Sequence, residues 1–145
     1  MEMIHVDTDI QLRDAFSQFE IDTERDIELT FSADAGEYEV FVRIKNCGKL
    51  RIRTFAYADA QVKYLFWNDN EHMFEIDETH EVLRNANVEV AHCEVNPYPV
   101  KRNTYMALRE PGAYGHLVSS SLVASDKNYK QNIVNFAQRT LANID

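Results

Sequence analysis

Apolar and polar residues alternate in four stretches of this chain, and each stretch begins at a small residue. The small residues are Gly36, Ala60, Ala86 and Ala113, which lie 24, 26 and 27 residues apart. Alternation with a period of two is typical of a β-strand, because successive side chains point to opposite faces of a sheet. A unit that recurs at this spacing is typical of a solenoid, in which each coil buries its apolar face against the next coil. The sequence therefore predicts an all-β protein, a short parallel β-helix.

A second strand follows the first in each repeat, so each coil is expected to contribute one strand to each of two facing sheets. The apolar positions of these second strands are Leu50 and Ile52, then Phe74 and Ile76, then Thr104, Met106 and Leu108, then Ile133, Val134 and Phe136. Clusters of Asn, Asp, Gly and Pro, which favour turns, separate the strands at residues 46–48, 68–70, 96–99 and 126–128.

If the four repeats stack in register, equivalent positions form columns that run from coil to coil. The third residue after each small residue points outward and gives a charged ladder: Glu39, Lys63, Glu89 and His116. The inward columns are Tyr38, Val62, Val88 and Gly115, and Val40, Tyr64, Val90 and Leu117. Opposite charges on neighbouring strands contribute roughly 0.2–1 kcal/mol a pair, so this register is expected to be favoured.

The first 32 residues lack the repeat and are predicted to form a cap on a single domain, with about four coils over residues 33–145. Within the cap, residues 8–20 have mixed apolar spacing that suits a short amphipathic helix, with Thr8 or Asp9 as its N-cap. Residues 27–31 alternate as a strand.

The composition limits the possible partners. The chain has 145 residues and a formal net charge of -9 at pH 7, which argues against binding to nucleic acid or to an anionic membrane. No apolar run approaches the length of a membrane span and the start has no basic region before an apolar stretch, so we expect a cytoplasmic protein. Cys47 and Cys93 are then expected to be reduced.

One outward column is apolar and is the main candidate for an interface. It comprises Phe41, Leu65, Ala91 and Val118, and Trp67 follows Leu65 on the outward side of the same strand. Soluble monomers avoid apolar patches of this kind unless something covers them. The cover could be a partner protein or the N-terminal segment that carries Phe16 and Phe19; the sequence leaves both open.

Histidine and cysteine side chains suggest a metal site. His92 and Cys93 are adjacent, and His80 and His116 are expected one coil away, which could gather nitrogen and sulfur ligands. The spacing matches no ligand signature, and His92 has the inward parity of a core histidine that holds a hydrogen bond. Cys93 could act as a nucleophile beside an imidazole, but no third orienting group is identifiable. We therefore predict that the protein is not an enzyme.

Acidic and aromatic residues suggest a carbohydrate function as an alternative. The acids Glu75, Asp77, Glu78 and Glu81 could bind a divalent cation or act as a glycosidase pair, although such a run is usually a solvated face. A carbohydrate-binding strip would need exposed aromatic side chains beside acids. The available residues are Trp67, Tyr64 and Glu75.

From about Glu71 onward the chain resembles the SufB/SufD family, the scaffold proteins of Suf iron-sulfur cluster assembly. The stretch MALREPGAYGHLVSSSLVASDKNYKQ, within residues 105–144, is similar to the family's pattern of strand, Gly-Ala turn, second strand with small residues and polar turn. The sequence NFAQRTLA at 135–142 resembles the family's H-x-A-P-x-T-x-S, with matches at Ala137 and Thr140. It departs from that motif at Asn135, Gln138 and Ala142.

The resemblance implies a right-handed parallel β-helix and a scaffold role beside other Suf-type proteins, such as the ATPase, another scaffold subunit or the cysteine desulfurase. The family's cluster-associated residues and its ATPase-docking segment lie in a later part of those proteins, so none is assigned here. A bound iron-sulfur cluster stays an open alternative, with His92 and Cys93 as the candidate ligands. We also predict a homodimer, joined through the last coil around Ile133, Phe136 and Leu141 or through the column of Phe41, Leu65 and Val118.

Overall fold

The computed structural model describes residues 1–121 and 127–145, and these residues form strands and connections without a helix. The first seven strands are β1 (Glu2–Ile4), β2 (Thr8–Gln11), β3 (Phe16–Asp22), β4 (Ile27–Ala33), β5 (Gly36–Asn46), β6 (Lys49–Ala56) and β7 (Ala60–Asn68). The others are β8 (Phe74–Val82), β9 (Asn87–Glu94), β10 (Val100–Leu108), β11 (Tyr114–Ser121), β12 (Lys127–Asn135) and β13 (Leu141–Ile144).

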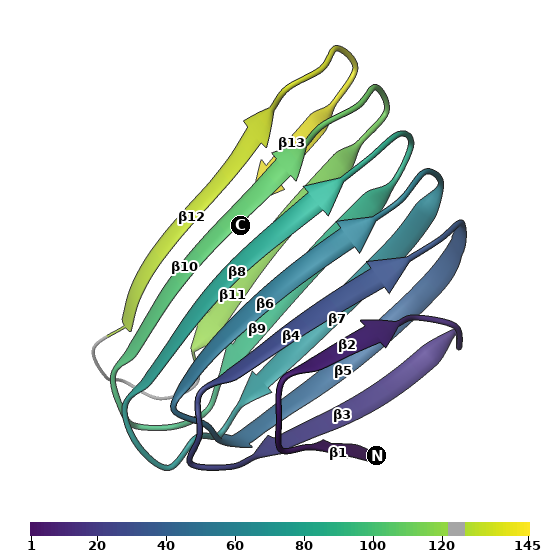
Figure 1. Ribbon diagram of the computed structural model, residues 1–145. Helices are drawn as coiled ribbons and strands as arrows, with labels where there is room; N and C mark the ends of the chain where they lie inside the picture. The colour runs from purple at the N-terminus through teal and green to yellow at the C-terminus, as the bar shows by residue number, and fades with distance from the viewer. Residues whose placement is uncertain (122–126) are drawn as a thin grey trace.

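The strands form two sheets that face each other across one core (Figure 1). The odd-numbered strands make a seven-stranded sheet and the even-numbered strands a six-stranded sheet, each in the order of the sequence. Neighbouring strands within each sheet are parallel, because the chain crosses to the opposite sheet and back before it returns beside its starting strand. The protein is a β-solenoid of stacked coils, as the sequence pattern predicts.

The register of the predicted columns is confirmed residue by residue. In the charged ladder, Glu39 pairs with Lys63, Lys63 with Glu89, and Glu89 with His116. The inward and apolar outward columns follow from the same pairing. Opposite charges and similar apolar groups therefore sit one above another along the solenoid.

The core lies between the two sheets and consists of inward side chains from both. Aromatic rings line its N-terminal half, where Phe31 contacts Phe19 and Tyr64 with ring centroids 5.8 and 5.4 Å apart. Gly115 occupies an inward position because the side chain of Met106 fills the space in front of it; a Cβ at residue 115 would meet the Met106 sulfur. The small residue in this column is thus set by packing across the core.

The N-terminal helical cap is a wrong prediction. Residues 8–20 hold β2 and the first part of β3, and β3 pairs with β5 so that Phe16 lies beside Glu39. Phe19 points into the core and Phe16 outward, so the apolar residues here do not share one face. The coils consequently extend through residues 1–32, which continue the solenoid instead of capping it.

Asparagine side chains hold the corner after the strands of the seven-stranded sheet. The side-chain oxygen of Asn70 accepts from the Cys47 amide at 3.1 Å, and its nitrogen donates to the Cys47 carbonyl at 3.2 Å.

The predicted turn at 96–99 lies between β9 and β10. Of the predicted turn at 126–128, Asp126 lies outside the described residues and Asn128 belongs to β12.

Candidate interaction surface and buried polar cluster

The outer face of the seven-stranded sheet carries the predicted apolar column. Phe41, Leu65, Ala91 and Val118 pair in register on β5, β7, β9 and β11. Leu65 is 39% exposed and the others are partly exposed. We call these four residues, together with Trp67, the apolar column. Among the described residues, no element packs over it, because the fold contains only the two sheets and their connections.

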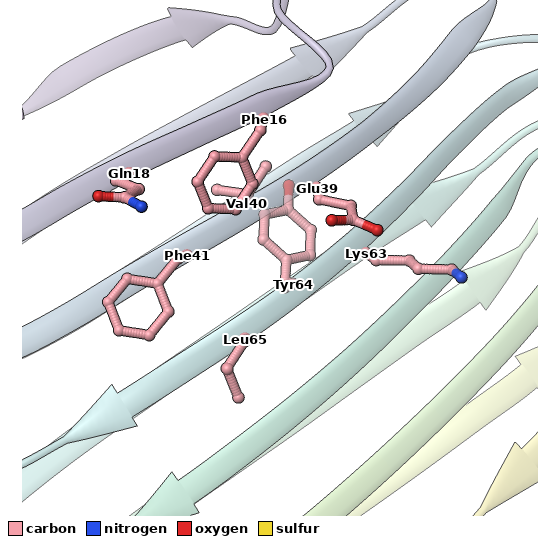
Figure 2. Close-up of a pocket in the computed structure, with 8 residues that line it drawn as sticks. All are labelled: Phe16, Gln18, Glu39, Val40, Phe41, Lys63, Tyr64 and Leu65. Atoms are coloured by element: carbon pink, nitrogen blue, oxygen red, sulfur yellow. The ribbon is translucent and has the colours of Figure 1, made fainter. Parts of the chain in front are cut away.

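A shallow hollow opens where the apolar column meets β3 (Figure 2). Its volume is about 400 Å³, and Phe16, Phe41 and Leu65 present their side chains around it. The N-terminal segment does not cover the apolar column, contrary to one of the two sequence interpretations. Phe19 is 4% exposed in the core, whereas Phe16 is 55% exposed and enlarges the apolar surface.

Charged side chains border the apolar column on both sides. On one side, the Lys63 ammonium lies 3.7 Å from the Glu89 carboxylate, and His116 Nε2 lies 2.6 Å from Asp145. On the other side, Arg43 lies 2.8 Å from Asp69. An apolar centre with a polar rim is the usual composition of a protein-protein interface.

The outer face of the six-stranded sheet differs in character. Lys49 lies 3.0 Å from Asp77, and Arg109 lies 2.6 Å from Glu81. Each ion pair joins two neighbouring coils, so these charges are paired within the sheet. The apolar column therefore distinguishes one face of the solenoid from the other.

A cluster of polar side chains lies inside the core, centred on Glu78 of β8. The Glu78 carboxylate accepts three hydrogen bonds: from His92 Nε2 at 2.6 Å, from His80 Nε2 at 3.2 Å and from the Thr104 hydroxyl at 2.8 Å. All four side chains are buried. A buried carboxylate needs such donors because it has lost its hydration.

The cluster continues toward the N-terminal coils through a chain of hydroxyl groups. His80 donates from Nε2 to Glu78, so in its neutral form Nδ1 is free to accept from the Thr54 hydroxyl at 2.8 Å. The Thr54 oxygen then accepts from the buried Tyr64 hydroxyl at 2.9 Å. Each group in this chain thus donates to the next group toward Glu78, and this common direction strengthens the hydrogen bonds.

A buried ion pair extends the cluster toward the C-terminal coils. Arg102 Nη1 lies 3.0 Å from Glu94 Oε1, and the other carboxylate oxygen of Glu94 accepts from Asn68 at 2.6 Å. Arg102 also donates to the Ser119 hydroxyl, and its guanidinium lies 3.9 Å from the centre of the Tyr129 ring. Pairing of this kind offsets the cost of burying a charge.

Burial and pairing shift the ionisation of the cluster. Burial on its own raises the pKa of Glu78, but His92 and His80 outweigh it and hold that pKa well below its usual range. Burial lowers the pKa of His92, and the attraction of Glu78 offsets this only in part. Burial also lowers the pKa of Arg102, against the opposing effects of Glu78 and Glu94. At neutral pH the cluster holds Glu78 ionised beside a neutral His92.

The residues proposed as metal or catalytic candidates do not come together. His92 points into the core and Cys93 points out of the sheet, while His116 lies on the outer face. In the described part of the chain, no three His, Cys, Asp or Glu side chains are arranged to hold a metal ion. The geometry therefore fits neither a metal nor an iron-sulfur cluster at His92 and Cys93.

The thiol groups are also poorly suited to nucleophilic chemistry. Burial, with Glu94 nearby, raises the pKa of Cys93. Burial raises the pKa of Cys47 to about 12. Both cysteines are free, and thiols with raised pKa values are weak nucleophiles at neutral pH.

The residues of the carbohydrate interpretation lie in three different environments. Trp67 is on the outer face of the seven-stranded sheet, Tyr64 is buried, and Glu75 is on the outer face of the six-stranded sheet. Of the acidic run, Glu78 points into the core, whereas Asp77 and Glu81 point outward and pair with basic side chains. No exposed strip combines these aromatic and acidic groups.

The remaining interface candidates belong to the last coil. Ile133 lies on β12 beside Met106 and is partly buried, and Phe136 follows that strand and is half exposed. The Arg109 guanidinium lies 4.2 Å from the centre of the Phe136 ring. Ile133 and Phe136 belong to the six-stranded side, so they form no common surface with the apolar column. The third candidate, Leu141, lies on β13 at the end of the seven-stranded sheet and is exposed.

No helix among the described residues is long and apolar enough to cross a membrane. Comparisons with protein-family models, with curated proteins and with solved structures found no match to this chain. The resemblance to the SufB/SufD family consequently stays a prediction. The functional argument rests on the geometry of the apolar column and of the buried polar cluster around Glu78.

Proposed function

We propose that this protein is a non-enzymatic scaffold that binds another protein subunit through the apolar column, in the service of iron-sulfur cluster assembly in the cytoplasm. The observation that carries the proposal is the uncovered apolar column on a regular sheet. Its residues come from four successive coils, so the solenoid holds them at fixed spacing before any partner arrives. A rigid surface of this kind loses little conformational freedom on binding.

The assignment to cluster assembly is supported by the sequence similarity at residues 105–144. This segment supplies β11, and with it Val118 at one end of the apolar column. The Suf-type ATPase, a further scaffold subunit and the cysteine desulfurase are therefore the first proteins to test as partners. The scaffold role needs no resident metal.

The proposal is tested by affinity capture of the tagged protein from its own cells under anaerobic conditions, followed by mass spectrometry. The matched variants are Leu65→Asp, in the apolar column, and Phe55→Asp, on the outer face of the six-stranded sheet. We expect the wild type and Phe55→Asp to recover a Suf-type protein and Leu65→Asp to lose it. Recovery of no Suf-type protein would contradict the role in cluster assembly, and equal recovery by both variants would contradict the role of the face.

A further inference from the structure

We infer that the subunit held by the apolar column is a second copy of this chain, in a symmetric dimer whose two-fold axis runs along the strands between β7 and β9. The inference rests on the proposed function and names the subunit that occupies the apolar column. A Suf-type protein recovered with the wild type is then bound to the dimer, and Leu65→Asp loses it because it loses the dimer. Two sheets can pack face to face about 10 Å apart. A two-fold axis along the strands reverses the order of the coils, so β7 faces β9 of the partner and β5 faces the partner's β11.

The charged ladder is complementary to itself under this operation. Its order along the solenoid is Glu39, Lys63, Glu89 and His116. The two-fold axis between β7 and β9 reverses this order in the partner. Lys63 then lies opposite the partner's Glu89, and Glu39 lies opposite the partner's His116. By symmetry each contact occurs twice. The alternation that pairs charges within one chain thus also pairs them between two chains.

The apolar column is complementary in size under the same operation. Leu65 falls opposite the partner's Ala91, and Phe41 falls opposite the partner's Val118, so each large side chain meets a smaller one. Trp67 likewise falls opposite the partner's Cys93. Large groups facing small ones let two sheets interdigitate at normal packing density.

The other face-to-face arrangement, with the axis along the columns, lacks this complementarity. It places Lys63 over the partner's Trp67 and Glu89 over the partner's Cys93, so the Glu89 carboxylate has no opposite charge across the interface. It also stacks Phe41 on its own copy, where two large side chains compete for the same space. The axis along the strands is therefore the arrangement that the observed register favours.

The size of the face agrees with a weak, reversible dimer. Six strands, from β3 to β13, span roughly 24 Å, and seven residues of strand span roughly 23 Å. The two copies together then bury about 1,100 Å² of flat sheet, slightly above the lower limit for a specific interface. A packing angle near 30° tilts the axis by about 15° from the strands. The contacts of β7 with β9 lie at the axis and are moved least by that tilt.

The test compares Lys63→Glu and Glu89→Lys, separately and mixed, by sedimentation equilibrium beside the wild type. Each variant alone places like charges across the interface twice, so we expect dimerisation at least tenfold weaker than in the wild type. In the mixture, each acidic ladder meets a basic one, and we expect dimers to return as heterodimers. The pair of Lys63 and Glu89 within each chain, 3.7 Å apart, stays broken in the mixture, so recovery reports only the contact between chains.

The matched control is Lys49→Glu on the six-stranded sheet, where Lys49 makes a similar ion pair with Asp77; it is expected to dimerise as the wild type does. Circular dichroism checks that the variants fold. A mixture that stays monomeric, or a wild type that is monomeric at every concentration, would overturn the inference. If the wild type is monomeric but still recovers Suf-type proteins, and Leu65→Asp loses them, the proposed function stands and the dimer fails. If the wild type dimerises but recovers no Suf-type protein, the dimer stands and the proposed function fails.

Discussion

Replacement of Glu78 by leucine is expected to destabilise the fold severely, although the two side chains are similar in size. The change removes the acceptor of three buried donors, His80, His92 and Thr104. An orphaned buried donor costs roughly 1–3 kcal/mol, so the three together are expected to cost about 3–9 kcal/mol. Domains of this kind are stable by about 5–15 kcal/mol in total, and Glu78→Leu therefore removes a large share of the stability.

The measurement is urea unfolding, followed by the fluorescence of Trp67. With a slope of about 2 kcal/mol per molar, the midpoint is expected to fall by about 1.5–4.5 M without a change of slope. The control is Glu75→Leu, on the outward side of the same strand, where the effect is expected to stay within about 0.5 kcal/mol.

A compensated variant keeps the reasoning testable if Glu78→Leu fails to fold. When Glu78, His80 and His92 become leucine, Thr54 and Thr104 become valine and Tyr64 becomes phenylalanine, no orphaned donor remains around the former carboxylate. Apolar replacement of a whole buried polar cluster is often neutral or stabilising, so we expect this variant to regain at least half of the loss. A cost below about 1 kcal/mol for Glu78→Leu, or no recovery in the compensated variant, would refute the account of the cluster.

Three further predictions concern pH, packing and thiol chemistry. Burial lowers the pKa of His92 below 6.5, so on acidification the unfolded chain takes up a proton that the folded chain does not; the free energy of unfolding should fall from pH 7 to pH 5, and less so in His92→Gln. Gly115→Ala forces a Cβ against the Met106 sulfur and should lower the thermal midpoint by several degrees, about 1–3 kcal/mol of overpacking; an unchanged midpoint would show that Met106 moves freely. In the Leu65→Asp monomer, a thiol reagent should modify Cys93 but not Cys47; rapid modification of both would contradict the burial of Cys47.

The repeat made much of the fold predictable. The small residues from Gly36 to Ala113 each mark the start or the edge of a strand in the seven-stranded sheet, and residues at equal offsets after them pair in register. The charged ladder followed directly. The N-terminal coils were missed because Phe16 and Phe19 point to opposite faces, which disguises the alternation as a helical spacing.

The polar cluster was only partly visible in the sequence. His92 was recognised as a possible core histidine from its inward parity, and its hydrogen bond to Glu78 agrees with that interpretation. Glu78 was grouped with acids of both parities, although it alternates with Phe74, Ile76 and His80 and so belongs inside. Parity was the available signal for Glu78. The partners of Arg102 across the core could not be inferred, because they depend on how the two sheets face each other.

The most direct test of the interaction face is sedimentation equilibrium of the wild type, Leu65→Asp and Phe55→Asp across micromolar concentrations. We expect the wild type and Phe55→Asp to dimerise, and Leu65→Asp to remain a folded monomer because a carboxylate in the apolar column would have to be desolvated twice at the two-fold axis. Dimerisation of Leu65→Asp as strong as that of the wild type would show that the apolar column is not the interface.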